Sequence, residues 1–90
     1  MNMKSRWVAF YEDTVQMLDH EGFDYREDND GVILVQGDVH VITVFIAQDI
    51  NDDPKPVAEC STVHERTGKD ANYKDLRTIK GIQNFIERFQ

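Results

Sequence analysis

The chain has 90 residues, of which 40% are hydrophobic and nine are aromatic. This length and composition predict one folded domain over residues 1–90 with a single modest core, and they argue against a disordered tail. The formal net charge is −7, with residues 1–53 carrying a net −9 and residues 54–90 a net +2. Contact with nucleic acid phosphates needs clustered Lys and Arg. The acidity therefore argues against direct nucleic acid binding and favours a basic protein surface as partner.

The compartment is predicted from what the chain lacks. No stretch is long and apolar enough to cross a bilayer, and the N-terminus has no apolar signal-peptide core. The single cysteine, Cys60, has no partner for an internal disulfide, which is typical of a reducing compartment. We therefore expect a cytoplasmic protein that makes no membrane contact.

The first predicted element is an amphipathic helix over residues 5–21. Apolar side chains recur from Trp7 to Leu18 at steps of three and four residues, and acidic and amide side chains fall on the opposite side. Ser5 is positioned to cap the start of this helix, and Gly22 to end it in a left-handed conformation.

Four strands are predicted next, over residues 23–27, 32–36, 39–47 and 56–66. The third of them is apolar at both of its alternating sets of positions, so it is expected at the centre of a sheet whose two faces both need cover. The fourth is more polar and is expected at an edge. The connections are predicted as a turn at residues 28–31, a two-residue loop at Gly37 and Asp38, and a polar loop over residues 48–54.

A second helix is predicted to follow a turn at residues 67–70. Asn72 and Asp75 have the spacing of a capping box in front of it. Its apolar stripe consists of Leu76, Ile79, Ile82, Phe85, Ile86 and Phe89. Because two-residue loops cannot join parallel strands, the predicted fold is a two-layer α+β domain. In it, a four-stranded antiparallel meander is flanked by the N- and C-terminal helices, in the order α-β-β-β-β-α.

The loops also predict the pairing of the strands. A two-residue loop at residues 37 and 38 places Leu34 opposite Val41. A loop centred near residue 52 places His40 opposite His64.

The coverage of the sheet has two solutions. Either both helices cover one face, which leaves an apolar face open to a partner or a second copy, or each face receives one helix. We expect the first arrangement. The open face is then centred on Val41 and Phe45 or on Ile42 and Val44.

His40 and His64 are the best candidate pair for chemistry. Zinc needs three or four nitrogen or sulfur ligands, and Cys60 lies roughly 13 Å from His64 along the same strand. We therefore expect no metal. The two histidines make either ordinary hydrogen bonds at the sheet margin or a pH-sensitive contact. The same separation argues against Cys60 as a nucleophile, and we expect a buried structural thiol.

Two aspartate-rich loops match part of a calcium-binding pattern. In residues 28–31, the EF-hand pattern fails because its first ligand position falls on Arg26 and its bidentate position on Gly37. In the second loop, Pro54 occupies the glycine position. The chain also has no glycine-rich phosphate loop and no Ser-His-Asp arrangement. We expect no cofactor and no enzymatic activity.

The acidic side chains of two loops form the main candidate binding site. We define the acidic patch as Asp24, Glu27, Asp28, Asp30, Asp49, Asp52 and Asp53. One interpretation is a solvated surface that keeps a small domain soluble. The other is that these carboxylates steer the domain onto a basic protein surface, where they stand in for the phosphates of a nucleic acid.

In size, acidity and lack of catalytic motifs, the chain resembles small immunity proteins and phage-encoded inhibitors. The resemblance covers composition and implies a non-enzymatic inhibitor or regulator. Our first hypothesis is that the acidic patch docks on a basic, nucleic-acid-binding protein. The alternative is a homodimeric chaperone-like or structural adaptor that acts through an open sheet face at Val41 and Phe45. A third hypothesis is a small catalytic or metal-dependent protein that uses His40 and His64.

Overall fold

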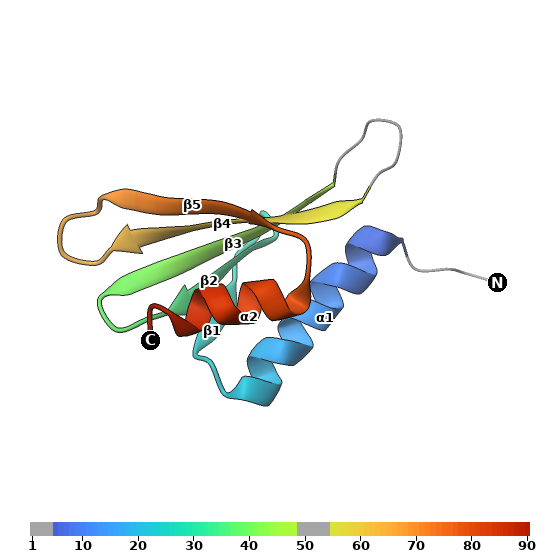
Figure 1. The fold of residues 1–90 in the computed structure, drawn as a ribbon, viewed down its shortest axis with the longest axis horizontal. Coiled ribbons are helices and arrows are strands. Elements are labelled where there is room, and N and C mark those ends of the chain that lie inside the picture. Colours follow the sequence, from blue (N-terminus) through green and yellow to red (C-terminus); the bar gives the residue numbers. More distant parts are fainter. Residues whose placement is uncertain (1–4, 49–54) are drawn as a thin grey trace.

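Residues 5–48 and 55–90, which the computed structural model describes, form one antiparallel sheet with helices on one side (Figure 1). The elements are α1 (Arg6–Glu21), β1 (Tyr25–Glu27), β2 (Val32–Gln36), β3 (His40–Gln48), β4 (Pro56–His64), β5 (Asp70–Leu76) and α2 (Ile79–Glu87). The strand order is β1-β2-β3-β4-β5, so every strand pairs with its neighbour in sequence. The predicted α+β class and antiparallel meander are confirmed, but the predicted count of four strands is wrong, because the described residues form five.

α1 forms as predicted, with both caps in place. The Ser5 side chain accepts a 3.1 Å hydrogen bond from the Val8 N–H, which satisfies one of the free donors at the helix start. Gly22 ends the helix with a φ of 73°. The Trp7 indole donates a 2.6 Å hydrogen bond to the Ile46 carbonyl oxygen. This bond fixes the first turn of α1 to β3.

β5 is the strand that the sequence prediction missed. It covers residues 70–76, which were assigned to a turn and to the first turn of the second helix. Along it, Leu76 lies opposite Ala58 of β4. β4 therefore has a neighbour on each side, and its predicted place at the sheet edge is wrong.

α2 begins later than predicted, at Ile79. The side-chain oxygen of Thr78 accepts a 3.0 Å hydrogen bond from the Gly81 N–H, so Thr78 is the N-cap. Asn72 and Asp75 lie in β5 and do not form the predicted capping box.

The ladder between β4 and β5 contains a bulge. The register shifts between Cys60 and Thr62, and Asn72 on β5 has a positive φ of 59°. Asparagine is one of the few residue types that adopt this conformation readily. The Asn72 side-chain amide donates a 2.8 Å hydrogen bond to Thr62 Oγ1, and the Thr62 hydroxyl donates to the Ala71 carbonyl oxygen at 3.3 Å. Side-chain hydrogen bonds thus hold the irregular backbone in place.

The predicted register of β2 and β3 is wrong by two residues. Val35 lies opposite Ile42, and the Gly37 N–H donates a 2.8 Å hydrogen bond to the His40 carbonyl oxygen. The two-residue loop is therefore 38–39, one residue later than predicted. Because side chains alternate between faces, a shift of two residues leaves the predicted composition of each face unchanged.

Gly37 occupies a crowded position beside the C-terminus. A Cβ atom there would lie 2.5 Å from the Phe89 carbonyl oxygen and 2.7 Å from the His40 carbonyl oxygen. The Asp38 N–H donates a 2.8 Å hydrogen bond to the same Phe89 oxygen. Glycine at this position lets the loop between β2 and β3 approach the end of the chain.

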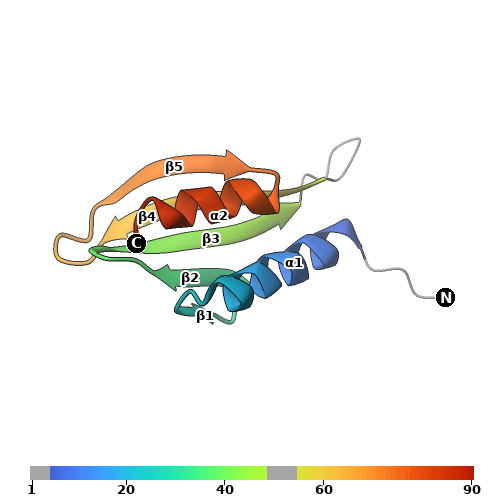
Figure 2. The same ribbon diagram turned by 60° about the horizontal axis from the view of Figure 1, so that its bottom comes forward.

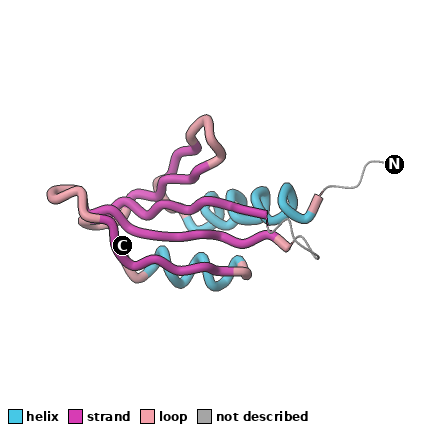
Figure 3. Tube along the Cα trace, turned by 90° about the horizontal axis from the view of Figure 1, so that it is seen from above, coloured by secondary structure: helices cyan, strands magenta, loops and turns pink. Residues whose placement is uncertain are grey.

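The core lies between the sheet and the two helices, which cover the same face (Figures 1 and 2). Figure 3, seen from above, shows the strands in front and both helices behind them. Buried side chains from the sheet are Ile33, Val35, Ile42, Val44, Ile46, Ala58 and Cys60, and those from the helices are Met17, Leu18, Ile82, Phe85 and Ile86. The predicted same-face arrangement is confirmed, and the open face is the one that carries Val41 and Phe45. Among the described residues, no helix is long and apolar enough to cross a membrane.

Candidate functional site

Four residues of the acidic patch lie on β1 and in the turns beside it. Asp24, Glu27, Asp28 and Asp30 are all exposed. Asp49, Asp52 and Asp53 lie outside the described residues. Because β1 is an edge strand of the sheet, the four described carboxylates lie where another molecule can reach them.

Two tyrosines join this part of the molecule to α1. The Tyr11 hydroxyl donates a 2.5 Å hydrogen bond to Glu27 Oε1, and the Tyr25 hydroxyl donates a 2.7 Å hydrogen bond to Asp19 Oδ1. Partial burial and then the bond to Glu27 raise the pKa of Tyr11 to about 12. The bond to Asp19 and then burial raise the pKa of Tyr25 to about 12. Both bonds join β1 to α1 and hold β1 in position.

Asp28 organises the turn between β1 and β2. Its Oδ1 atom accepts hydrogen bonds from the Asp30 N–H at 2.9 Å and from the Val32 N–H at 3.0 Å. Gly31 completes the turn with a φ of 79°. The predicted turn at residues 28–31 is confirmed.

Asp24 and Asp30 differ from the other two acids of the patch. Within the described part of the chain, their carboxylates make no hydrogen bond and no ion pair, and the same holds for the neighbouring Arg26. Among the four described acids of the patch, these two carboxylates have no hydrogen-bond partner within the part of the protein that the structure describes, so they are free to meet another molecule.

Two shallow hollows flank β1. One, of about 340 Å³, lies between α1 and β1 and is lined by Tyr11, Glu12, Val15, Gln16 and Glu27. The other, of about 200 Å³, lies over β1, β2 and β3 and is lined by Asp24, Tyr25, Arg26, Leu34, Gln36 and Val41. Each combines acidic and apolar atoms, which suits the charged head and the apolar stem of a basic side chain.

The second candidate surface is the open face of the sheet. Val41, from the predicted interface, is half-buried, while Phe45 has 38% of its surface exposed. Tyr73 of β5 has 73% exposed and was missed, because its segment was assigned to a helix. The sequence offers only a weak signal for it: Thr78 can also cap a helix, and a helix that starts at Ile79 leaves Tyr73 in an extended segment.

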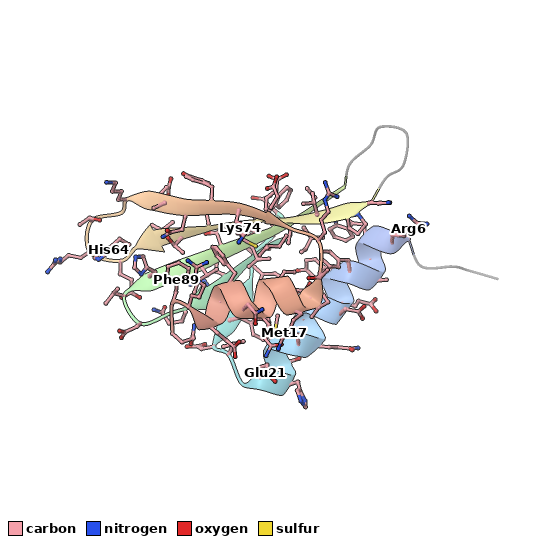
Figure 4. All side chains as sticks on the ribbon, viewed as in Figure 1. Arg6, Met17, Glu21, His64, Lys74 and Phe89 are labelled. Atoms are coloured by element: carbon pink, nitrogen blue, oxygen red, sulfur yellow. The ribbon has the colours of Figure 1, made fainter. Side chains whose placement is uncertain are left out.

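His40 and His64 are paired across β3 and β4, as predicted. Their ring centroids are 5.1 Å apart, and His40 also contacts the Phe89 ring at 5.4 Å. His64 and Phe89 are labelled in Figure 4 at the same end of the sheet. His64 Nδ1 accepts hydrogen bonds from the backbone N–H groups of Arg66 at 3.2 Å and Thr67 at 3.4 Å, so this histidine holds the turn before β5.

Cys60 is buried in the core with a free thiol, as predicted. Burial, followed by the nearby charge of Asp75, raises the pKa of Cys60 to about 12. The thiol is therefore protonated at neutral pH. Among the described residues, no group of three His, Cys, Asp or Glu side chains is arranged to hold a metal ion.

The raised tyrosine pKa values predict a loss of stability at alkaline pH. Unfolded tyrosines ionise near pH 10, whereas folded Tyr11 and Tyr25 keep their protons up to about pH 12. Their contribution to stability is present below pH 10 and is lost as the pH rises towards 12. Between pH 8 and 11, the urea-unfolding free energy of the wild type should therefore fall more than that of Tyr11→Phe/Tyr25→Phe. Ionisation of Cys60 lowers the unfolding free energy of both proteins equally. An equal fall in the wild type and the double variant would therefore contradict the raised pKa values of Tyr11 and Tyr25.

Comparison of the chain with models of known protein families, with curated proteins and with solved structures finds no match. An assignment of function therefore rests on the surfaces of the molecule itself.

Proposed function

We propose that this chain is a non-enzymatic binding protein, an inhibitor or regulator, that docks its acidic patch on a basic surface of another protein. The observation that carries the proposal is the pair of exposed carboxylates of Asp24 and Asp30, which form no ion pair with a described side chain. An inhibitor that covers a nucleic-acid-binding protein needs such an array, because carboxylates can occupy the positions of phosphates. With its one free cysteine, the protein is proposed to act in the cytoplasm.

The geometry favours a rigid docking surface. The hydrogen bonds of Tyr11 and Tyr25 to Glu27 and Asp19 hold β1 on α1, and Asp28 closes the adjoining turn. A rigid array loses little conformational entropy when it binds. The excess of negative charge in the first half of the chain also attracts a basic partner over distances near the Debye length, about 8–10 Å at physiological ionic strength.

The test uses charge reversal at the two residues that have no structural bond. Asp24→Lys/Asp30→Lys should lose the partner that the wild-type protein captures from the lysate of its native host. With the captured partner purified, the association rate should fall about tenfold or more, because electrostatic steering is removed. Asp28 is left unchanged, because its carboxylate holds the turn.

The matched control is Asp70→Lys/Glu87→Lys, which changes the net charge equally. Asp70 lies on β5, at the sheet edge opposite β1, and Glu87 lies on α2. This control should retain the partner and most of the association rate. If both variants lose the partner and the association rate equally, the binding depends on the net charge of the protein and not on the acidic patch. Retention of the partner by the Asp24/Asp30 variant would overturn the proposal.

The alternative function, a homodimeric adaptor that acts through the open sheet face, is favoured by the exposure of Phe45 and Tyr73 on that face. The same capture experiment separates the two functions. Release of the partner at moderate salt supports the acidic patch, since exposed charges are screened. Association that survives high salt and the Asp24/Asp30 reversal supports the adaptor, because burial of apolar surface does not weaken as salt rises.

A further inference from the structure

A row of four residues crosses the open face of the sheet. Val32 on β2 lies opposite Phe45 on β3, Phe45 lies opposite Glu59 on β4, and Glu59 lies opposite Asp75 on β5. Like charges directly opposite each other destabilise a sheet. Within the described part of the chain, neither Glu59 nor Asp75 makes a hydrogen bond or an ion pair. The row therefore ends in two uncompensated carboxylates side by side.

Neither of the bases close to Asp75 in the sequence, Lys74 and Arg77, forms an ion pair with it. Lys74 precedes Asp75 in the chain but is paired with Cys60, so the pleat directs it to the face that carries the helices. Figure 4 labels Lys74 on β5. It forms no ion pair with a described acid.

Exposed aromatic rings flank the two carboxylates. Phe45 is 38% exposed and Tyr73 is 73% exposed. Together they line a groove of about 260 Å³. Its other lining residues are Thr43, Glu59, Ser61 and Asp75, which belong to the open face, and Cys60 and Lys74, whose side chains alternate to the other face. Sites for drug-sized ligands have volumes of about 300–1,000 Å³. This groove is smaller and suits a single side chain.

We propose that this groove receives an arginine side chain from an apolar segment of the partner protein. A guanidinium group is planar, donates hydrogen bonds in a fork that matches carboxylates, and stacks on aromatic faces. The groove supplies two carboxylates and two aromatic rings in one place. Half-buried Val41 and Val63 continue the open face beside it and fit apolar residues that flank the arginine.

This inference rests on the proposed function in one respect, that the partner is basic. The groove itself lies on β3, β4 and β5, whereas the described acids of the patch lie on β1 and in the turns beside it, at the opposite edge of the sheet. The two surfaces can therefore be tested separately.

The probe is the blocked pentapeptide acetyl-Leu-Val-Arg-Val-Leu-amide, titrated into ¹⁵N-labelled protein and followed by NMR. We expect saturable shifts of the backbone amides of Phe45, Glu59, Tyr73 and Asp75. The same peptide with citrulline in place of arginine has nearly the same shape and no charge, and it should bind at least about tenfold more weakly.

The protein variant is Glu59→Gln/Asp75→Asn, which should also bind the arginine peptide at least about tenfold more weakly. It should unfold at the same or a higher temperature than the wild type, because it removes like-charge repulsion. Asp70→Asn, a single charge removal on the same strand, should leave the affinity unchanged. Tyr73→Leu should weaken binding about threefold or more, through the lost contact with the ring.

Four results would overturn the proposal. They are the absence of saturable shifts, equal binding of the citrulline peptide, shifts confined to β1 and its turn, and an arginine supplied by a second copy. The last would appear as concentration-dependent shifts of the groove residues without peptide, abolished by Arg26→Gln, because Arg26 lies on the same face.

Loss of the lysate partner in Asp24→Lys/Asp30→Lys with intact peptide binding would show that the two surfaces act independently. If Glu59→Gln/Asp75→Asn still captures the partner from the lysate, the partner binds through the acidic patch and does not need the groove.

Discussion

Replacement of Ile42 by alanine is expected to lower the free energy of unfolding by about 2–5 kcal/mol. Ile42 is fully buried on β3, the central strand of the sheet, on the face that both helices cover. Its truncation removes apolar contacts and leaves a cavity that neighbouring side chains fill only in part. A domain of this size is stable by roughly 5–13 kcal/mol, so a large share of its stability would be lost. Urea unfolding followed by circular dichroism measures the change.

Val41→Ala is the matched control for Ile42→Ala. The two residues are neighbours on β3, but Val41 lies on the open face and is only half-buried. Its truncation should cost about 1 kcal/mol or less. Comparable losses at both positions would mean that both faces of the sheet are packed equally, and the open face would have to be abandoned as a binding surface.

Gly37→Ala is expected to cost about 1–3 kcal/mol for a different reason. The new Cβ atom would meet two backbone carbonyl oxygens, those of Phe89 at 2.5 Å and of His40 at 2.7 Å. Neither oxygen belongs to a side chain that can rotate away, so the loop and the C-terminus must separate. The 2.8 Å bond from the Asp38 N–H to Phe89 would be lost.

Two measurements test this effect of Gly37→Ala. The urea midpoint reports the loss of stability, and hydrogen exchange of the Asp38 amide reports the detachment of the C-terminus. Asp38→Ala alters the same loop without adding atoms near Phe89, and it should change the stability by no more than about 0.5 kcal/mol. Slow exchange of the Asp38 amide in Gly37→Ala would contradict the proposed steric conflict.

Local sequence signals predicted the elements whose caps and periodicity agree. α1 has Ser5 before its apolar stripe and Gly22 after it, and both act as the sequence indicates. β3 is apolar at both alternating sets of positions, and it occupies the centre of the sheet. In these segments the local preferences and the tertiary contacts favour the same structure.

β5 could not be predicted in the same way. Its residues are polar, and five of its seven positions are exposed, so it lacks the apolar alternation that identifies a strand. Leu76 and Ile79 are three residues apart, which matches a helical stripe, although one ends a strand and the other begins a helix. The segment is a strand because β4 offers it an unpaired edge. That long-range contact leaves no periodic signal in the sequence.

The candidate site also combines features that local sequence signals predict with features that depend on contacts between distant segments. The turn at Asp28 was predicted, because an aspartate that bonds the backbone two residues later is a local feature. The bonds from Tyr11 to Glu27 and from Tyr25 to Asp19 join segments that are distant in the sequence or depend on the packing of β1 against α1. They could be found only in the folded chain, and they separate the acids with a structural role from Asp24 and Asp30.

The bulge at Asn72 has a consequence for how copies of this domain meet. An incoming strand that adds to a sheet needs an unbroken row of backbone donors and acceptors along the edge. β5 interrupts that row with a residue at positive φ and carries charges at Asp70, Lys74 and Asp75. Edge-to-edge growth into filaments is therefore blocked on this side of the sheet. On this side of the molecule, contact between copies is therefore left to the open face of the sheet rather than to its edge.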